Sequence, residues 1–297
     1  MFRKLLILIA LGLSTPLFSQ TIDEVKTRMQ AINNPNGVTF YNMDGYRITS
    51  EEINKPFTEK GMRKSLRQYN LGDLKGKKDE QLGLNNLYFS MSDKVTETCS
   101  VTTSYYFIEN SGGTISFITF SAANKHDQDF DRNIAKLIMN KQIPSECFEP
   151  MEIRGSINFA GRKLELNSNC YWTSINTVQC PYDGEMNWSM HKDAADAKLA
   201  IDSQMEITKA HDVEVISQST IDVIFEDVPT TAVKVVYDLK GIASVAGGMS
   251  GGKTLTAYYI AEAVRGNYIS CVMSHWNNDD IQNGGLPILL SRVMKLK

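Results

Sequence analysis

The segment Tyr258-Tyr-Ile-Ala-Glu-Ala-Val-Arg-Gly-Asn-Tyr-Ile-Ser-Cys-Val-Met-Ser-His-Trp276 decides how the C-terminal part of this 297-residue chain is expected to fold. Its two aromatic and β-branched runs, separated by Arg-Gly-Asn, are typical of a strand, a tight turn and a second strand. The glycine-rich run Gly247-Gly-Met-Ser-Gly-Gly-Lys-Thr254 lies directly before it. A nucleotide-binding or nucleophile motif in that run requires a helix after it, so the two interpretations exclude each other. We predict the hairpin.

The glycine run matches the P-loop pattern as Gly247-x4-Gly252-Lys253-Thr254. In a P-loop, backbone N–H groups surround the phosphates, the lysine contacts the β- and γ-phosphates, and the threonine binds Mg²⁺. The segment Tyr268–Met273 lacks the terminal Asp of a metal-binding strand. We therefore interpret the run as a loop between strands and predict no cofactor. Nucleotide binding at Gly247–Thr254 is kept as an alternative.

The same run contains Gly248-Met-Ser-Gly-Gly252, which matches Gly-x-Ser-x-Gly. A nucleophile elbow needs an acid and then a histidine later in the chain, whereas His275 precedes Asp279 and Asp280. A secreted serine hydrolase that uses Ser250 is the alternative function.

Four residues are worth testing if the protein is an enzyme: Ser250, Lys253, Cys271 and His275. Cys271 and His275 are expected on one face of a strand, where a thiol–imidazole pair or a metal site is an option. A core cysteine and a histidine at the rim are the simpler interpretation. We predict no catalytic and no metal-binding residues.

The N-terminal segment Met1–Gln20 is typical of a signal peptide. Arg3 and Lys4 precede the apolar run Leu5–Leu13, and Pro16 follows it. The run is too short to cross a bilayer of about 30 Å. No later segment is apolar enough to span a membrane, so we predict an exported protein, periplasmic or secreted.

The five cysteines are Cys99, Cys147, Cys170, Cys180 and Cys271. An oxidising compartment favours at least one disulfide. Cys170 and Cys180 bracket a segment with a strand–turn–strand pattern, which brings its ends together, so we favour this pair. The odd count leaves one thiol free or paired between chains.

Composition excludes few functions. The hydrophobic fraction of 42% and the charged fraction of 22% are ordinary for a folded protein. A net charge of −3 gives no general attraction to nucleic acid, and we predict no nucleic-acid partner.

Hydrophobic periodicity predicts an α+β protein with two similar domains, residues 21–145 and 146–297. Each domain is expected to be an antiparallel sheet flanked by helices and closed by a C-terminal helix. The segment Tyr105–Ser121 precedes an acidic-capped helix, as Tyr258–Ser274 precedes an apolar one, which indicates an internal duplication. The expected helices cover residues 21–33, 58–69, 130–141 (stopped by Pro144), 193–209 and 280–297.

The phrase Ile221-Asp-Val-Ile-Phe-Glu-Asp-Val-Pro-Thr-Thr-Ala-Val-Lys-Val-Val-Tyr237, followed by the tyrosine hairpin, resembles the PsbP-like family of small exported α/β domains. The resemblance covers mainly Cys180–Lys297. It implies an antiparallel sheet flanked by helices and a mostly non-catalytic, partner-binding role. It transfers no site residues.

We therefore predict an exported, non-enzymatic protein that binds a partner protein or a cell-envelope component.

Overall fold

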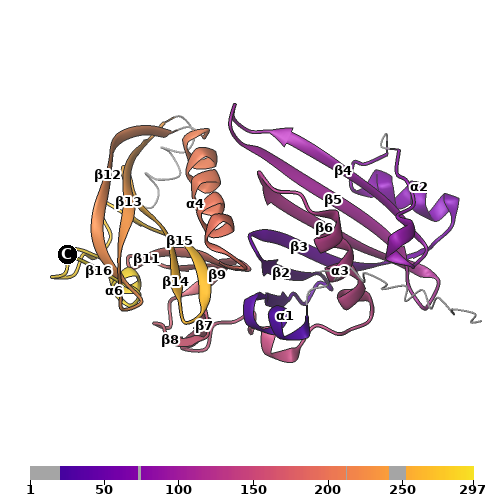
Figure 1. Ribbon diagram of the computed structural model, residues 1–297, viewed down its shortest axis with the longest axis horizontal. Coiled ribbons are helices and arrows are strands. Elements are labelled where there is room, and N and C mark those ends of the chain that lie inside the picture. Colours follow the sequence, from indigo (N-terminus) through magenta and orange to yellow (C-terminus); the bar gives the residue numbers. More distant parts are fainter. Residues whose placement is uncertain (1–20, 73–74, 212, 241–251) are drawn as a thin grey trace, which may run out of the picture.

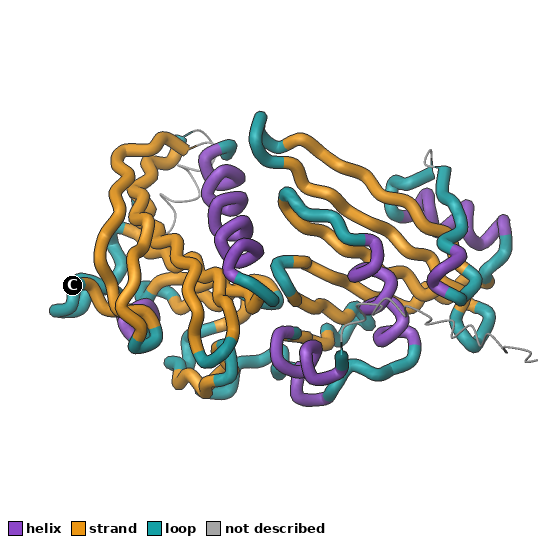
Figure 2. Tube along the Cα trace, in the orientation of Figure 1, coloured by secondary structure: helices purple, strands orange, loops and turns teal. Residues whose placement is uncertain are grey.

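The computed structural model describes residues 21–72, 75–211, 213–240 and 252–297. These residues form two large antiparallel sheets with one long helix, α4 (Ala194–Lys209), on the side of the second sheet that faces the first (Figure 1). Strands predominate and helices are few (Figure 2). The predicted α+β class, with helix-flanked sheets closed by C-terminal helices, is therefore wrong: the protein is β-rich.

The first sheet has six strands in the order β1-β2-β3-β6-β5-β4. The run Tyr105-Tyr-Phe-Ile108 carries apolar side chains to both faces of this sheet, where they join two separate cores. The strands are β1 (Gln30–Asn33), β2 (Thr39–Met43), β3 (Tyr46–Pro56), β4 (Asn86–Lys94), β5 (Ser100–Glu109) and β6 (Thr114–Ala123).

Helices pack on parts of both faces of the first sheet. On one face, α1 (Ile22–Arg28) and α3 (Gln128–Met139) pack on a core that includes Tyr46 and Tyr106. On the other face, α2 (Glu59–Gln68) covers only the end of the sheet around Phe107 and Phe117. The part of that face that α2 leaves uncovered includes the strand ends near Arg47, Val101 and Ser121, which lie toward the second sheet and α4.

The second sheet has eight strands in the order β16-β12-β13-β14-β15-β11-β10-β9. Only the last three residues of β12 pair with β16, over Val223–Phe225. The strands are β9 (Tyr171–Ser174), β10 (Thr177–Cys180), β11 (Gly184–His191), β12 (Val213–Phe225), β13 (Val228–Leu239), β14 (Thr254–Val264), β15 (Asn267–Trp276) and β16 (Met294–Leu296).

Two hydrophobic cores lie on opposite faces of the second sheet. One surrounds Trp188 and is covered by α6 (Ile288–Ser291) and by the hairpin of β7 (Ser156–Phe159) and β8 (Arg162–Glu165). The other packs Ile201 of α4 against Tyr237 and Tyr259, whose hydroxyls hydrogen-bond at 2.9 Å.

The two sheets share a strand order. In each sheet, the chain first forms a meander of three strands, then a helix, and then a second meander. The last strand of the second meander pairs with the third strand of the first meander. These pairs are β3–β6 in the first sheet and β11–β15 in the second. Residues 30–123 supply the first sheet and residues 171–296 the second. This shared order is what an internal duplication would produce, but the duplication and the division at 145/146 stay predictions.

The tyrosine hairpin is confirmed. β14 and β15 pair from Leu255↔Trp276 to Val264↔Asn267, with Arg265 and Gly266 in the turn at positive φ. Because a strand begins at Thr254, the chain after the glycine run is not the helix that a P-loop or a nucleophile elbow requires.

Two predicted helices are wrong in part. The expected helix over 280–297 is reduced to α6, because Gly284, Gly285 and Pro287 interrupt it, and β16 follows. The expected helix over 21–33 ends at Arg28, where the extended Met29 leads into β1. The helices expected near 58–69, 130–141 and 193–209 are confirmed as α2, α3 and α4.

The predicted disulfide Cys170–Cys180 is confirmed. The other three cysteines are free and buried. In the part of the chain that the structure describes, no helix combines the length and the apolarity needed to cross a bilayer.

Candidate functional site

A cleft of about 400 Å³ lies where the exposed part of the first sheet faces the second sheet and α4. Its lining comes from both sheets, from α4 and from the turn between β2 and β3. Most of the lining side chains are polar. This makes the cleft the best candidate for a binding site among the described residues.

A row of neighbouring side chains across three strands forms the wall on the first sheet. Asn42 pairs with Arg47, and Arg47 pairs with Ser121. Residues directly opposite in an antiparallel ladder share a face, so all three side chains point the same way. Arg47 is exposed, and no ion pair joins it to another described residue. It is the uncompensated charge of the cleft.

The opposite wall comes from alternate residues of β11. Asn187, Ser189 and His191 point into the cleft, while the residues between them point into the core around Trp188. The Asn187 amide donates to Thr177 Oγ1 at 2.7 Å. This strand therefore presents a column of hydrogen-bonding groups to the cleft.

His191 and Ser270 form a buried pair in this wall. His191 Nε2 lies 2.8 Å from Ser270 Oγ, and no hydrogen bond reaches His191 Nδ1 from a described residue. A Cβ on Gly45 would lie 3.2 Å from His191 Cε1, so the absence of a side chain at Gly45 gives the imidazole its room. Burial, and then the charge of Lys125, lower the pKa of His191 to about 4. The ring is neutral at pH 7.

A serine next to a histidine raises the question of nucleophilic catalysis. Three features oppose it. No described acid orients His191 through Nδ1, as a triad requires. An imidazole of pKa about 4 is a weak base at neutral pH. Ser270 lies in β15 between β11 and β14, so its backbone belongs to a sheet ladder and is not placed as an oxyanion donor.

The acidic groups at the floor of the cleft are already paired. Arg28 binds Asp44 through two hydrogen bonds of 2.9 and 3.2 Å. The Lys125 ammonium lies 2.7 Å from Asp196 and 3.3 Å from the Asp44 carbonyl oxygen. The Asp44 amide donates to the Met190 carbonyl at 3.0 Å. The Lys125–Asp196 and Asp44–Met190 contacts join the first sheet to α4 and the second sheet, and Arg47 remains the available charge.

The residues singled out from the sequence do not assemble into a site. Ser250 lies outside the described residues. The Lys253 amide donates to Asn277 Oδ1 at 2.7 Å at the start of β14. Cys271 is fully buried, and burial raises the pKa of its thiol well above the ordinary value.

Cys271 and His275 share a strand face as predicted, but four residues of strand separate them by roughly 13 Å. The His275 ring instead stacks on Tyr258 at 6.1 Å. Within the described ranges, no group of three or more His, Cys, Asp or Glu residues could hold a metal ion.

Sequence reasoning missed Arg47, His191 and Ser270. The alternation of β11, Glu-Met-Asn-Trp-Ser-Met-His from Glu185 to His191, is a period-two signal that could have identified its polar face. No comparable signal identifies Arg47, because its role depends on how the two sheets face each other.

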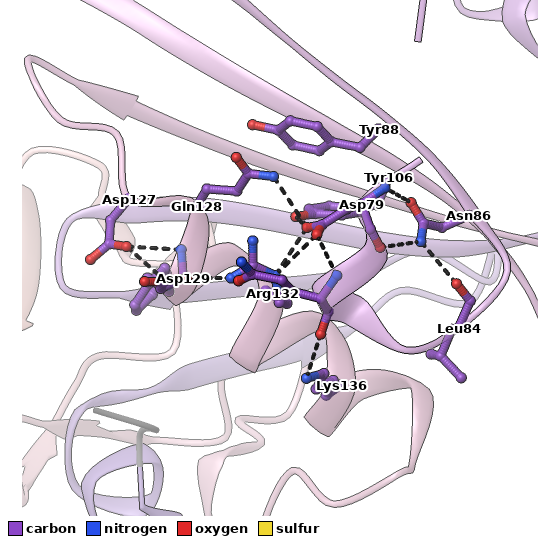
Figure 3. Close-up of polar contacts among 12 residues, drawn as sticks. Asp79, Leu84, Asn86, Tyr88, Tyr106, Asp127, Gln128, Asp129, Arg132 and Lys136 are labelled. Atoms are coloured by element: carbon purple, nitrogen blue, oxygen red, sulfur yellow. Dashed lines mark hydrogen bonds and ion pairs between the residues drawn. The ribbon is translucent and has the colours of Figure 1, made fainter. Parts of the chain in front are cut away.

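A second polar cluster surrounds Asp79 in the first sheet (Figure 3). Its carboxylate accepts hydrogen bonds from Tyr106 at 2.8 Å, Arg132 at 3.0 Å and Gln128 at 3.1 Å. Burial alone would raise the pKa of Asp79, but these bonds hold it below the ordinary value. The Asp79 carboxylate thus finds its hydrogen-bond donors within the protein. The cluster is structural, and it attaches the loop before β4 to α3.

Comparisons with known proteins identify no family. No protein-family model matches the sequence, and no curated protein matches it. A search of solved structures gives the di-domain ARO/CYC StfQ from the steffimycin biosynthetic pathway, at 10% identity and a TM-score of 0.15, over 91% of this chain and 86% of that one. A TM-score this low supports no argument about fold or function.

Proposed function

We propose that this is an exported, non-catalytic binding protein, periplasmic or secreted, and that a cell-envelope component binds in the cleft between its sheets. The group that enters the cleft is a small hydroxylated carboxylate, such as a sugar acid. The observation that carries this proposal is the exposed, unpaired Arg47 in a cleft whose other charged lining residues, Asp44, Lys125 and Asp196, are already in ion pairs.

The chemistry of the lining supports such a ligand. A guanidinium binds a carboxylate through two parallel hydrogen bonds. Asn42 Oδ1 and His191 Nδ1 are buried atoms without a hydrogen-bond partner among the described residues. Such atoms are rare in folded proteins, and they mark the lining of the cleft as polar. The volume of about 400 Å³ lies within the range of small-ligand sites.

The test is calorimetric titration of the mature chain with glucuronate and with glucose, its neutral counterpart. We expect glucuronate to bind and Arg47→Gln to weaken that binding at least tenfold, because one good charged hydrogen-bond pair contributes roughly 1.5–3 kcal/mol. The control is Arg63→Gln, an exposed arginine on α2. Equal binding of glucose, or unchanged affinity in Arg47→Gln, would overturn the proposal.

The serine-hydrolase alternative has a separate signature. It predicts covalent labelling of Ser250 by a fluorophosphonate probe, and loss of labelling in Ser250→Ala. The strand that begins at Thr254 opposes it, because a nucleophile elbow leads into a helix. The same strand opposes nucleotide binding at Gly247–Thr254, for which stabilisation by Mg-ATP on heating is the corresponding signature.

A further inference from the structure

A second cavity, of about 360 Å³, lies at the other end of the same face of the second sheet. Its floor is one row of the ladder, in which Gln179 pairs with Glu185 and Glu185 pairs with Ser274. Glu185 precedes Asn187 of the cleft by two residues on β11, so the two cavities are about 7 Å apart along the strand. We call the second cavity the tyrosine pocket.

Aromatic side chains form the walls of the tyrosine pocket. They come from Tyr171, Tyr182 and Trp276. Tyr171 and Tyr182 are unusually open for tyrosines, with 47% and 61% of their surface exposed. Aromatic faces that remain accessible in a cavity can stack on a ligand or bind a cation.

The backbone holds Tyr182 in an unfavourable conformation. Its φ of 66° lies in the left-handed region, which a bulky residue rarely adopts. Cys180, two residues earlier, is fixed by the disulfide to Cys170, and the Tyr182 carbonyl accepts a hydrogen bond of 2.8 Å from the Asp280 amide. Strained residues concentrate at functional sites, where the surrounding structure maintains them.

The charge of the tyrosine pocket is negative. Two acids, Glu185 and Asp279, line it, and no lysine or arginine is among its lining residues. The Asp279 carboxylate accepts a hydrogen bond of 2.8 Å from the Trp276 amide, which fixes its position at the wall. No ion pair or hydrogen bond joins the Glu185 side chain to another described residue.

Burial affects both acids in the same way. It raises the pKa of Glu185 and of Asp279 above the ordinary values, and the charges of Asp183 and Asp280 add to the effect at Asp279. Both carboxylates are partly removed from water and have no lysine or arginine beside them among the described lining residues. A positively charged ligand group would therefore stabilise their charged form.

We propose that the tyrosine pocket binds an organic cation, an alkylammonium or guanidinium group, between its aromatic walls and its two carboxylates. The cation lies on the faces of the tyrosines and pairs with Glu185 at the floor and Asp279 at the wall. Cation–π contact and charge pairing both act on the same group, so the pocket selects a cation over a neutral group of equal size.

The test compares matched probes by calorimetric titration of the mature chain. The probes are N-acetyl-lysine methylamide, its neutral counterpart N-acetyl-norleucine methylamide, and cadaverine. We expect the lysine derivative to bind at least tenfold more tightly than the norleucine derivative, and less tightly as salt concentration rises. Binding of cadaverine alone identifies a free amine as the ligand, whereas binding of the lysine derivative identifies a side chain of a partner.

Four variants assign the effect to the tyrosine pocket. Glu185→Gln and Tyr182→Ala should each weaken binding about tenfold, because one removes the charge and the other a wall. The matched controls, Glu97→Gln in the loop between β4 and β5 and Tyr268→Ala at the far end of β15, should leave it unchanged. Tyr182 is exposed, so its variant tests the pocket even if Glu185→Gln fails to fold.

Equal affinity for the lysine and norleucine derivatives overturns the proposal, as does unchanged affinity in Tyr182→Ala. The proposal is also overturned if neither the lysine derivative nor cadaverine shows saturable binding. Binding of glucose to this pocket with no binding of either cation would replace it with a sugar site.

Discussion

Asp131 is a fully buried carboxylate in the first turn of α3. Neither of its oxygens has a hydrogen-bond partner among the described residues. Burial, with a contribution from the charge of Asp127, raises its pKa to about 7. The sequence pattern predicted that the acids of this turn cap the helix. That is confirmed for Asp127, whose carboxylate accepts from the Asp129 and Phe130 amides.

The raised pKa of Asp131 makes stability depend on pH in a defined direction. Its folded pKa lies above the unfolded value near 3.9, so the protonated acid favours the folded state at low pH, and this advantage is lost as pH rises from about 4 to about 7. Asp131→Asn removes the titration. We expect the variant to gain roughly 4 kcal/mol over the wild type at pH 8 and almost nothing at pH 4.

Urea denaturation at both pH values measures this difference. Asp93→Asn, at an exposed position of β4, is the control and should show no such pH dependence. A gain for Asp131→Asn that is equal at pH 4 and pH 8 would contradict the assignment to ionisation.

At the scale of elements, the Asp79 cluster shows how a long polar segment is held in place (Figure 3). Besides its side-chain contacts, Asp79 exchanges two hydrogen bonds with Asn86, through its amide at 3.0 Å and its carbonyl at 2.9 Å. Lys136 of α3 donates to the Gln81 carbonyl at 3.0 Å. One aspartate thus ties the loop, β4 and α3 together.

Arg132 offers an internal comparison, because it pairs with a buried acid and an exposed one. Asp79→Ala leaves a guanidinium that is only 10% exposed without its buried partner, and we expect a loss of about 3–5 kcal/mol. Asp129→Ala removes a partner that is 77% exposed, and we expect a loss below about 1 kcal/mol. Chemical denaturation of the two variants checks the difference, and equal losses would show that burial does not set the cost.

The elements that the sequence predicted well are those whose signals are local. The tyrosine hairpin, α3 and α4 each have an internal period and a defined start or stop. The predicted C-terminal helix failed because its apolar residues suit either a helix or a short strand. Met294–Leu296 form a strand because the edge of β12 offers a partner there. Strand order could not be read in this way, since β3–β6 and β11–β15 join segments far apart in the chain.

At the scale of the whole molecule, polar contacts join the two sheets at the floor of the cleft. Lys125 follows β6, Asp196 lies in the first turn of α4, and both side chains are largely buried. Lys125→Met leaves Asp196 without its near partner at 2.7 Å, and we expect a loss of about 2 kcal/mol in the free energy of unfolding.

The same aspartate supplies a matched control for this contact. Lys192 lies 3.7 Å from Asp196 but is 55% exposed, so Lys192→Met should cost less than about 1 kcal/mol. Thermal unfolding of both variants tests the contrast. A similar loss in both would mean that the junction is not held by the buried pair.

The candidate cleft itself lay beyond sequence reasoning for a related reason. Arg47 and His191 belong to different sheets, and the binding surface exists only because those sheets face each other. The pattern of β11 marks one polar wall, but the sequence carries no local signal for the relative placement of two sheets.

The distribution of thiols has a consequence for how the chain folds under oxidising conditions. Cys170 and Cys180 are ten residues apart, so closing their loop costs little chain entropy, and we expect this bond to form early, ahead of non-native pairings. Cys99, Cys147 and Cys271 become inaccessible once the cores form. Oxidative maturation then depends on a competition between core formation and disulfide scrambling, and rapid burial reduces the need for an isomerase.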